Sequence, residues 1–279
     1  MSHARQLPIS ARHAFAQALD LAVRRDALQS LFVPFLLHAP WIVGQSMLPG
    51  PDEPGGMTSR NLYLNSVVLV GDFCLARALE TVALTGSLTA VQSLAATVTE
   101  MAEGEVAQLE RAGNPDATVD DYFRVIDRKT ASLFAWCARV GGTLGPTLDA
   151  ALGRYGRAVG RAFQIADDVL DCAVDEVTAG KSVGQDIQEG KLTLPILYAC
   201  ESNPELATLV RAKLGERAVS PADARAILTA TIAAGGVDRA RAKARDLVAS
   251  AVAELEVLPA SVYRSALTEL AALSVDRKF

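Results

Sequence analysis

The sequence predicts an all-α protein that folds as one domain over residues 1–279. Three observations support this prediction. Half of the residues are hydrophobic, which is enough to build a sizeable core and does not fit a disordered chain. Alanine and leucine dominate the composition, and both are strong helix formers. No alternation of apolar and polar residues persists long enough to indicate a β-strand.

The first part of the chain contains a long stretch without any charged residue, 27–51. A helix that spans a membrane needs roughly 20 consecutive apolar residues. Pro34 and Pro40 interrupt this stretch, and proline breaks the hydrogen bonding of a helix interior. We therefore favour a buried, kinked core segment over a membrane span, and a monotopic membrane contact stays open as an alternative. The loop PGPDEPGG at 49–56 is predicted to be mobile.

A capping signal in the middle of the chain predicts a long helix. Thr118 followed three residues later by Asp121 indicates the start of a helix. The helix is predicted to run towards Val140, and the glycine-rich segment GGTLGP at 141–146 follows it.

A second clear start signal lies closer to the C-terminal end. Ser220 before Pro221 predicts a helix over 221–234, because serine is a favoured N-cap and proline a favoured first helical residue. Gly235 and Gly236 are expected to end this helix. We find no internal repeat and no convincing domain boundary, so a single helical domain is the simplest interpretation.

Charge and cysteine content exclude several classes of protein. The formal net charge is −5, with both signs interspersed, so nucleic acid is not an expected partner. The opening residues are polar and include Arg5 and Arg12, which does not fit a secretory signal. The four cysteines are far apart and form no CxxC pair, which fits a reducing cytoplasm and no zinc or disulfide framework. They are Cys74, Cys137, Cys172 and Cys200.

The segment FQIADDVLDCAVDEVTAGK at 163–181 places carboxylates on an otherwise apolar helix. Residues three or four apart share a helix face, so its polar residues form one stripe. The stripe consists of Gln164, Asp167, Asp168, Asp171 and Asp175. Neighbouring carboxylates repel one another, and more so when partly buried. Such a stripe is expected either on a solvated face or around a bound cation.

Residues beyond this helix favour the cation. Lys181 follows a Thr-Ala-Gly turn, and a second lysine, Lys191, stands in the glycine-containing run that comes next. Carboxylate oxygens suit Mg²⁺, which keeps waters and phosphate oxygens in its coordination shell. Lysines nearby would balance the remaining phosphate charge. The combination predicts a site in which a metal ion bridges to a diphosphate.

The run FQIADDVLD…GKSVGQDIQEGKLTLPILYA closely resembles the second aspartate-rich region of the trans-isoprenyl diphosphate synthases, also called the polyprenyl synthetase family. Three weaker matches lie upstream, at 65–78, 100–109 and 121–142, so the resemblance covers roughly residues 60–200. It implies an isoprenoid-synthase-type helical bundle around a central cavity. In that family an allylic diphosphate ionises, and isopentenyl diphosphate attacks the resulting carbocation.

The resemblance also implies roles for individual residues. The catalytic, metal-binding positions would ligate Mg²⁺ and, through it, an allylic prenyl diphosphate; they are Asp167, Asp168 and Asp171. The positions that would contact the diphosphate directly are Lys129, Thr130, Gln164 and Lys181.

Each contact residue has a plainer alternative outside the family context. Lys129 would be an ordinary surface lysine, Thr130 would bond its own helix backbone, and Gln164 would be a satisfied core residue. Agreement at all the contact positions favours the diphosphate role. Glu103 and Glu105, by contrast, are predicted to form a solvated face.

The sequence departs from the family in its first part. The first DDxxD motif, the arginine pair after it and an earlier GGKR segment are all missing, and the charge-free stretch 27–51 stands in their place. His38 is followed by Ala39 and Pro40, and Arg60 stands alone. These missing groups would hold two of three metal ions and part of isopentenyl diphosphate, so their loss is expected to slow ionisation about a thousand-fold or more.

Three functions remain open from the sequence. The favoured one is a divergent prenyltransferase that binds an allylic prenyl diphosphate through Mg²⁺, with isopentenyl diphosphate as a candidate second substrate. The second is a non-catalytic regulatory subunit of a heteromeric prenyl diphosphate synthase. The third is a terpene cyclase or diphosphate lyase. The resemblance implies a homodimer, or a heterodimer with a full synthase, and the cysteine usage fits a cytoplasmic location.

Overall fold

The computed structural model of this chain describes residues 71, 73–140, 146–173, 184–214 and 219–276. Contacts divide the chain into two compact units, Met1–Ala95 and Ala96–Phe279. Every regular element in the described ranges is a helix, which confirms the all-α prediction. The charge-free stretch 27–51 and the loop 49–56 lie outside the described residues, so the predictions made for them stay predictions.

The described part of the first unit is helical. One helix covers 73–84, and a turn at Thr85 and Gly86 leads into α4 (Leu88–Arg111). Gly86 has a φ of 69°, a left-handed conformation that glycine adopts at little cost. The remainder of α4, from Ala96 onward, belongs to the second unit.

All other described elements lie in the second unit. The first group consists of α5 (Val119–Ile126), the π-helix η2 (Asp127–Ala131), α6 (Ser132–Val140) and α7 (Pro146–Ala173). The second group consists of α9 (Gln185–Gln188), α10 (Leu194–Ser202), α11 (Pro204–Leu214) and α12 (Pro221–Ala233). The last group consists of α13 (Gly236–Glu254), the short 3₁₀ helix η3 (Leu255–Val257) and α14 (Val262–Leu273).

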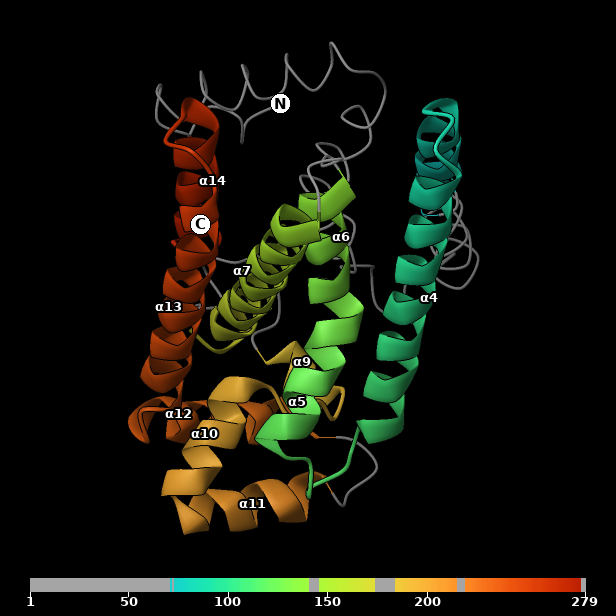
Figure 1. Cartoon of the computed structure of the whole chain (residues 1–279). Helices are drawn as coiled ribbons and strands as arrows, with labels where there is room; N and C mark the ends of the chain where they lie inside the picture. The colour runs from blue at the N-terminus through green and yellow to red at the C-terminus, as the bar shows by residue number, and fades with distance from the viewer. Residues whose placement is uncertain (1–70, 72, 141–145, 174–183, 215–218, 277–279) are drawn as a thin grey trace, which may run out of the picture. The chain divides into compact units, whose positions relative to one another are not determined.

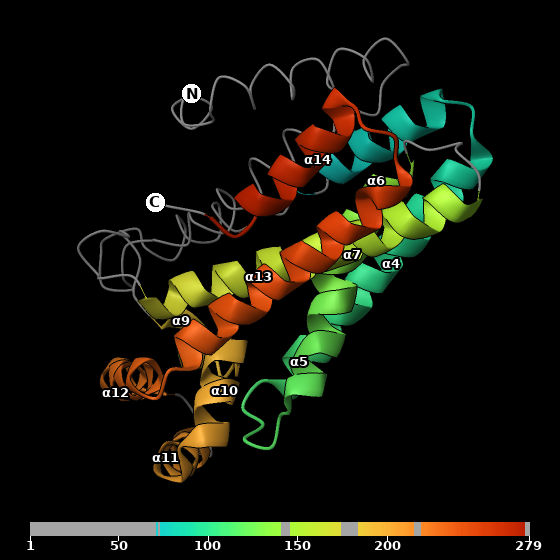
Figure 2. The same cartoon turned by 60° about the vertical axis from the view of Figure 1, so that its left-hand side comes forward.

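The long helix α7 forms the centre of this unit. It packs against α6 on one side and against α13 on another, as Figure 1 and Figure 2 show. The helices α10, α11 and α12 gather at the end of the bundle where α7 finishes (Figure 1). The main hydrophobic core fills the space between these helices and includes Ile165, Ile187, Leu194 and Ile227, each at most 1% exposed. The end of α7 that carries the aspartates is therefore held on several sides by packed helices.

The two predicted helix starts are confirmed. Thr118 caps α5, and its side chain and that of Asp121 exchange bonds with each other's backbone as a complete capping box. Ser220 caps α12 by accepting a bond from the amide of Asp223. The helical run predicted from Thr118 does reach Val140, but a π-helical turn, η2, interrupts it.

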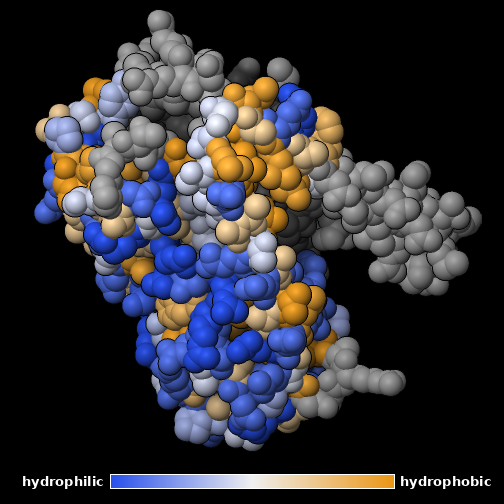
Figure 3. Space-filling model, turned by 45° about the vertical axis from the view of Figure 1, so that its right-hand side comes forward, coloured by the Kyte–Doolittle hydropathy of each residue, from blue (hydrophilic) through white to orange (hydrophobic). Residues whose placement is uncertain are grey.

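Among the described helices, none combines the length and the hydrophobicity that a membrane span requires. On the face drawn in Figure 3, hydrophilic residues cover most of the lower half, in keeping with the interspersed charges of the sequence. The single-domain organisation over 1–279 stays a prediction.

Candidate active site

Two of the predicted diphosphate contacts, Lys129 and Thr130, lie in the π-helical turn η2. A π-turn is wider than an α-turn, and such turns occur frequently at functional sites. Asp127 begins the turn and pairs with both Nε and Nη2 of Arg161 on α7, each at 2.5 Å. This bidentate ion pair fixes the start of the π-turn against α7.

Lys129 is held from the side of α4. Its Nζ lies 2.8 Å from Oε2 of Glu105 and donates a 2.6 Å hydrogen bond to Oε1 of Gln108. Gly104 allows this approach, because a Cβ at that position would overlap the backbone nitrogen of Lys129. Glu103 and Glu105 are exposed, as predicted, but Glu105 also orients the lysine.

A chain of hydrogen bonds connects η2 to the aspartates. Thr130 donates from Oγ1 to Oε1 of Gln164 at 2.9 Å, and Nε2 of Gln164 donates to Oδ1 of Asp168 at 2.9 Å. Oδ2 of Asp168 accepts a 2.6 Å bond from the hydroxyl of Tyr122. The structure therefore brings Thr130, Gln164 and Asp168 together although they are up to 38 positions apart in the sequence.

The three aspartates of α7 have different surroundings. Asp167 is exposed, whereas Asp168 is only 5% exposed. Asp171 is half-buried, and its carboxylate accepts hydrogen bonds from the backbone amides of Gln185 and Asp186 at the start of α9. The predicted stripe is thus not one uniform face, because its members point toward solvent, the bundle interior and α9.

Burial and repulsion by neighbouring carboxylates disfavour the charged forms of Asp168 and Asp171. The pKa of Asp168 lies well above its usual range because of burial and the nearby charge of Asp186, although bonds from Tyr122 and Gln164 oppose the shift. Burial and Asp186 raise the pKa of Asp171 to about 6. A bound cation would remove this repulsion.

Three participants are not among the site residues that the resemblance assigns, although Lys191 was expected to balance phosphate charge. Asp186 adds a fourth carboxylate, and burial raises its pKa. Lys191 lies 3.5 Å from Asp186 and 2.6 Å from Glu189. Both residues belong to the motif GKSVGQDIQEGK, and this motif is the sequence feature that could have indicated them. Tyr122 is the third, and nothing in its local sequence indicates a partner 46 residues away.

The described carboxylates suit a magnesium ion that is partly held by its substrate. No three of the described acidic, histidine or cysteine side chains form a cluster able to hold a metal by themselves. Mg²⁺ is usually bound through one or two carboxylates together with water and substrate phosphates. Asp167 and Asp171, four residues apart on α7, offer such a partial set of hard oxygen ligands.

The remaining predicted site residue, Lys181, lies outside the described residues, as does Asp175. The site also differs from the hollow of about 400 Å³ between the start of α5, α10 and α11. That hollow is lined in part by Val119, Leu197 and Arg211 and includes none of the predicted site residues.

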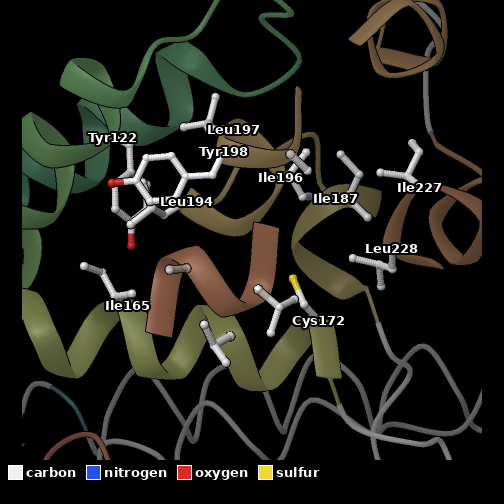
Figure 4. Packing of buried hydrophobic residues seen from close by; sticks show 14 of the residues in the cluster. Tyr122, Ile165, Cys172, Ile187, Leu194, Ile196, Leu197, Tyr198, Ile227 and Leu228 are labelled. Carbon is white, nitrogen blue, oxygen red and sulfur yellow. The ribbon is translucent and has the colours of Figure 1, made fainter. Parts of the chain in front are cut away.

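The core beneath the site is well packed. Figure 4 shows Tyr122 beside Ile165 and Leu194, among buried hydrophobic residues contributed by α5, α7 and α10. Its ring meets that of Phe123 edge-on, with centroids 5.5 Å apart. These contacts leave the tyrosine little freedom to move away from Asp168.

The chain is similar to known proteins over most of its length. Residues 56–231 match the family described as polyprenyl synthetase. The chain is 36% identical over 251 residues to the octaprenyl diphosphate synthase of Escherichia coli strain K12, covering 86% of this chain and 76% of the relative. It is 33% identical over 250 residues to the all-trans-nonaprenyl-diphosphate synthase (geranyl-diphosphate specific) of Rhodobacter capsulatus, covering 87% and 75%.

A solved structure shows the same fold. The polyprenyl synthase from Caulobacter crescentus CB15, complexed with calcium and isoprenyl diphosphate, matches with a TM-score of 0.74 and 35% identity, covering 96% of this chain and 82% of that chain.

These matches define the class of protein: the chain is a prenyltransferase of isoprenoid biosynthesis with an all-α fold. It belongs to the polyprenyl synthetase family, as the resemblance in its second aspartate-rich region indicated. The comparisons support the enzyme among the three functions considered and give no support to the regulatory subunit or to the cyclase or lyase.

Proposed function

We propose that this chain transfers the prenyl group of an allylic prenyl diphosphate to isopentenyl diphosphate, with Mg²⁺ held at the aspartates of α7. The observation that supports this proposal most strongly is a concentration of carboxylates beside the π-turn that carries Lys129 and Thr130, in which Asp167 and Asp186 repel the charged forms of Asp168 and Asp171. Such a concentration is costly without a cation and its anionic ligand.

The residues around the site would divide the work of holding the substrate. Lys129 would give a positive charge and Thr130 a hydroxyl to the diphosphate oxygens, and Gln164 links that hydroxyl to the aspartates. Lys181 remains a proposed diphosphate contact on the strength of the resemblance. Bound Mg²⁺ would stabilise the negative charge that grows on the departing diphosphate.

Lys129 would have to exchange partners when substrate binds. In the structure its charge is balanced by Glu105, whose side chain is 49% exposed. An exposed ion pair of this kind contributes little to stability, so a diphosphate with several negative charges can replace the glutamate. Gln108 can keep its hydrogen bond to Lys129 during that exchange, because it carries no charge.

The missing first motif bears on the rate rather than on the class of reaction. The charge-free stretch 27–51 supplies no carboxylate, so the α7 site would be the principal metal site of the chain. We propose that it binds the allylic substrate and turns it over slowly. Two further parts complete the proposal: a homodimer or heterodimer, supported by the family resemblance, and a cytoplasmic location, supported by the scattered cysteines.

A turnover assay tests the proposal. The purified chain is incubated with Mg²⁺, isopentenyl diphosphate and either geranyl or farnesyl diphosphate, and lipid products are identified by mass spectrometry. We expect products longer than the allylic substrate by whole prenyl units, and none when EDTA is added. Release of inorganic diphosphate without any elongated product, or no consumption of the allylic substrate, would contradict the proposal.

A further inference from the structure

Asp168 differs from the other aspartates in having both carboxylate oxygens held from inside the bundle. Tyr122 on α5 donates to Oδ2 at 2.6 Å, and Gln164 on α7 donates to Oδ1 at 2.9 Å. Only 5% of Asp168 is exposed, and 9% of Tyr122. Hydrogen bonds to a carboxylate are strong in such a buried setting, where water cannot compete.

The geometry of α7 separates Asp168 from its neighbours. Successive helical residues point in directions about 100° apart, whereas residues four apart share a face. Asp167 is exposed and Asp171 lies one turn further along the same edge, while Asp168 turns toward α5. The DDxxD motif therefore has an outer edge, Asp167 with Asp171, and one inner member.

We propose that Asp168 is a positioning residue rather than a metal ligand, and that Tyr122 is the group that fixes it. The inference rests on the proposed function and concerns the same site. The Tyr122–Asp168 hydrogen bond connects α5 to α7. It would thereby fix the position of Asp167 and Asp171 relative to the π-turn. The hydrogen bonds from Thr130 through Gln164 to Asp168 connect the π-turn with the aspartates of α7.

The structure offers a matched control for this bond. Tyr155 on α7 is 3% exposed and donates a 2.7 Å hydrogen bond to the carbonyl of Leu267. It lies roughly 20 Å from Asp168 along the helix, at about 1.5 Å per residue. Tyr155→Phe therefore removes a buried phenol hydrogen bond of similar length without touching the site, and reports the purely structural cost.

The test measures metal binding directly. Mn²⁺ is titrated in the presence of inorganic diphosphate and followed by electron paramagnetic resonance, with thermal unfolding recorded for each variant. We expect Tyr122→Phe to weaken Mn²⁺ binding about 10-fold, in the range typical of groups that orient metal ligands. Tyr155→Phe is expected to lower the Tm similarly but to leave Mn²⁺ binding at the parent value.

Asp168→Asn separates positioning from ligation. We expect it to weaken Mn²⁺ binding about as much as Tyr122→Phe, and the double variant to be no weaker than the worse single one, because both changes break the same link. Asp167→Asn, at the outer edge, is expected to weaken binding far more.

Two results would overturn the inference. One is loss of Mn²⁺ binding in Asp168→Asn as complete as in Asp167→Asn, which would make Asp168 a ligand. The other is a Tyr122→Phe variant that binds Mn²⁺ as well as Tyr155→Phe does. If the parent chain itself binds no Mn²⁺ with diphosphate, the proposed function fails and this inference fails with it.

Discussion

At the scale of single residues, the site depends on carboxylates kept where water solvates them poorly. Asp171 illustrates the balance: burial and Asp186 raise its pKa to about 6, while amide hydrogen bonds from α9 act in the opposite direction. A group with this pKa in the folded state and about 3.8 in the unfolded state binds more protons when folded. Its ionisation therefore destabilises the metal-free protein.

The destabilising effect of Asp171 ionisation gives a prediction for the variant Asp171→Asn. In EDTA, the parent's free energy of unfolding should lose at most about 3 kcal/mol from this residue as pH rises from 4 to about 6, and then level off. Asparagine does not ionise, so the variant should lack this part of the decrease, while Asp168 and Asp186 still contribute theirs. Urea unfolding at a series of pH values measures both curves. Parallel curves for parent and variant would contradict the assigned surroundings of Asp171.

Residue patterns predicted part of this site. The resemblance assigned Thr130 and Gln164 to the same diphosphate although they are 34 residues apart, and the structure joins them by a hydrogen bond. Tyr122 could not be found in that way, because its role depends on how α5 packs against α7. Helical spacing placed Asp168 on the same stripe as Asp167, but only the tertiary contacts show that it faces inward.

At the scale of elements, the contact between α4 and the π-turn η2 determines where Lys129 lies. Gly104→Ala should disturb this contact, because the added methyl group would overlap the Lys129 backbone. We expect a loss of about 1–3 kcal/mol in stability, as for other overpacked sites, and weaker binding of magnesium diphosphate.

Gly71 offers the matched control for that substitution. It is also helical, and a Cβ there would meet nothing within 4 Å. Gly71→Ala should therefore leave stability unchanged or raise it by up to about 1 kcal/mol. Equal effects of the two substitutions in urea unfolding would contradict the close approach of α4 to η2.

The N-terminal cap of α5 also supports the candidate active site, because it stabilises the helix that carries Tyr122. Thr118→Ala removes the capping box and should cost about 1 kcal/mol, and Ser220→Ala at α12 should cost about the same. Only the first variant should also weaken diphosphate binding, by a few-fold, because the first turn of α5 carries Tyr122. Calorimetry on both variants checks the difference, and an equal effect on binding would refute it.

These caps show what the sequence predicts well at this scale. Thr118 with Asp121 three positions later, and Ser220 directly before Pro221, are local signals, and both helix starts were confirmed. The π-turn at Asp127–Ala131 was not predicted, because the apolar spacing of that region reads as one continuous helix. Its widened turn is stabilised by contacts distant in sequence, among them the pair of Asp127 with Arg161.

At the scale of the whole molecule, family membership predicts prenyl transfer, whereas the altered N-terminal region predicts that the reaction is slow. The fold and the family are those of a polyprenyl synthetase, yet 27–51 carries none of the charge that the resemblance leads one to expect there. We predict prenyl transfer at a rate about a thousand-fold or more below that of the Escherichia coli relative. Side-by-side steady-state assays measure this ratio, and comparable rates would show that the first motif is dispensable here.

The central claim is that the outer edge of α7 binds a diphosphate through Mg²⁺, and calorimetric titration with farnesyl diphosphate tests it most directly. Three proteins are compared, with Mg²⁺ and with EDTA: the parent, the double variant Asp167→Ala/Asp171→Ala, and a control, Asp149→Ala, changed at the opposite end of α7. The parent and control should bind only when Mg²⁺ is present, and the double variant should not bind in either condition. Binding by the double variant equal to that of the parent would contradict the account.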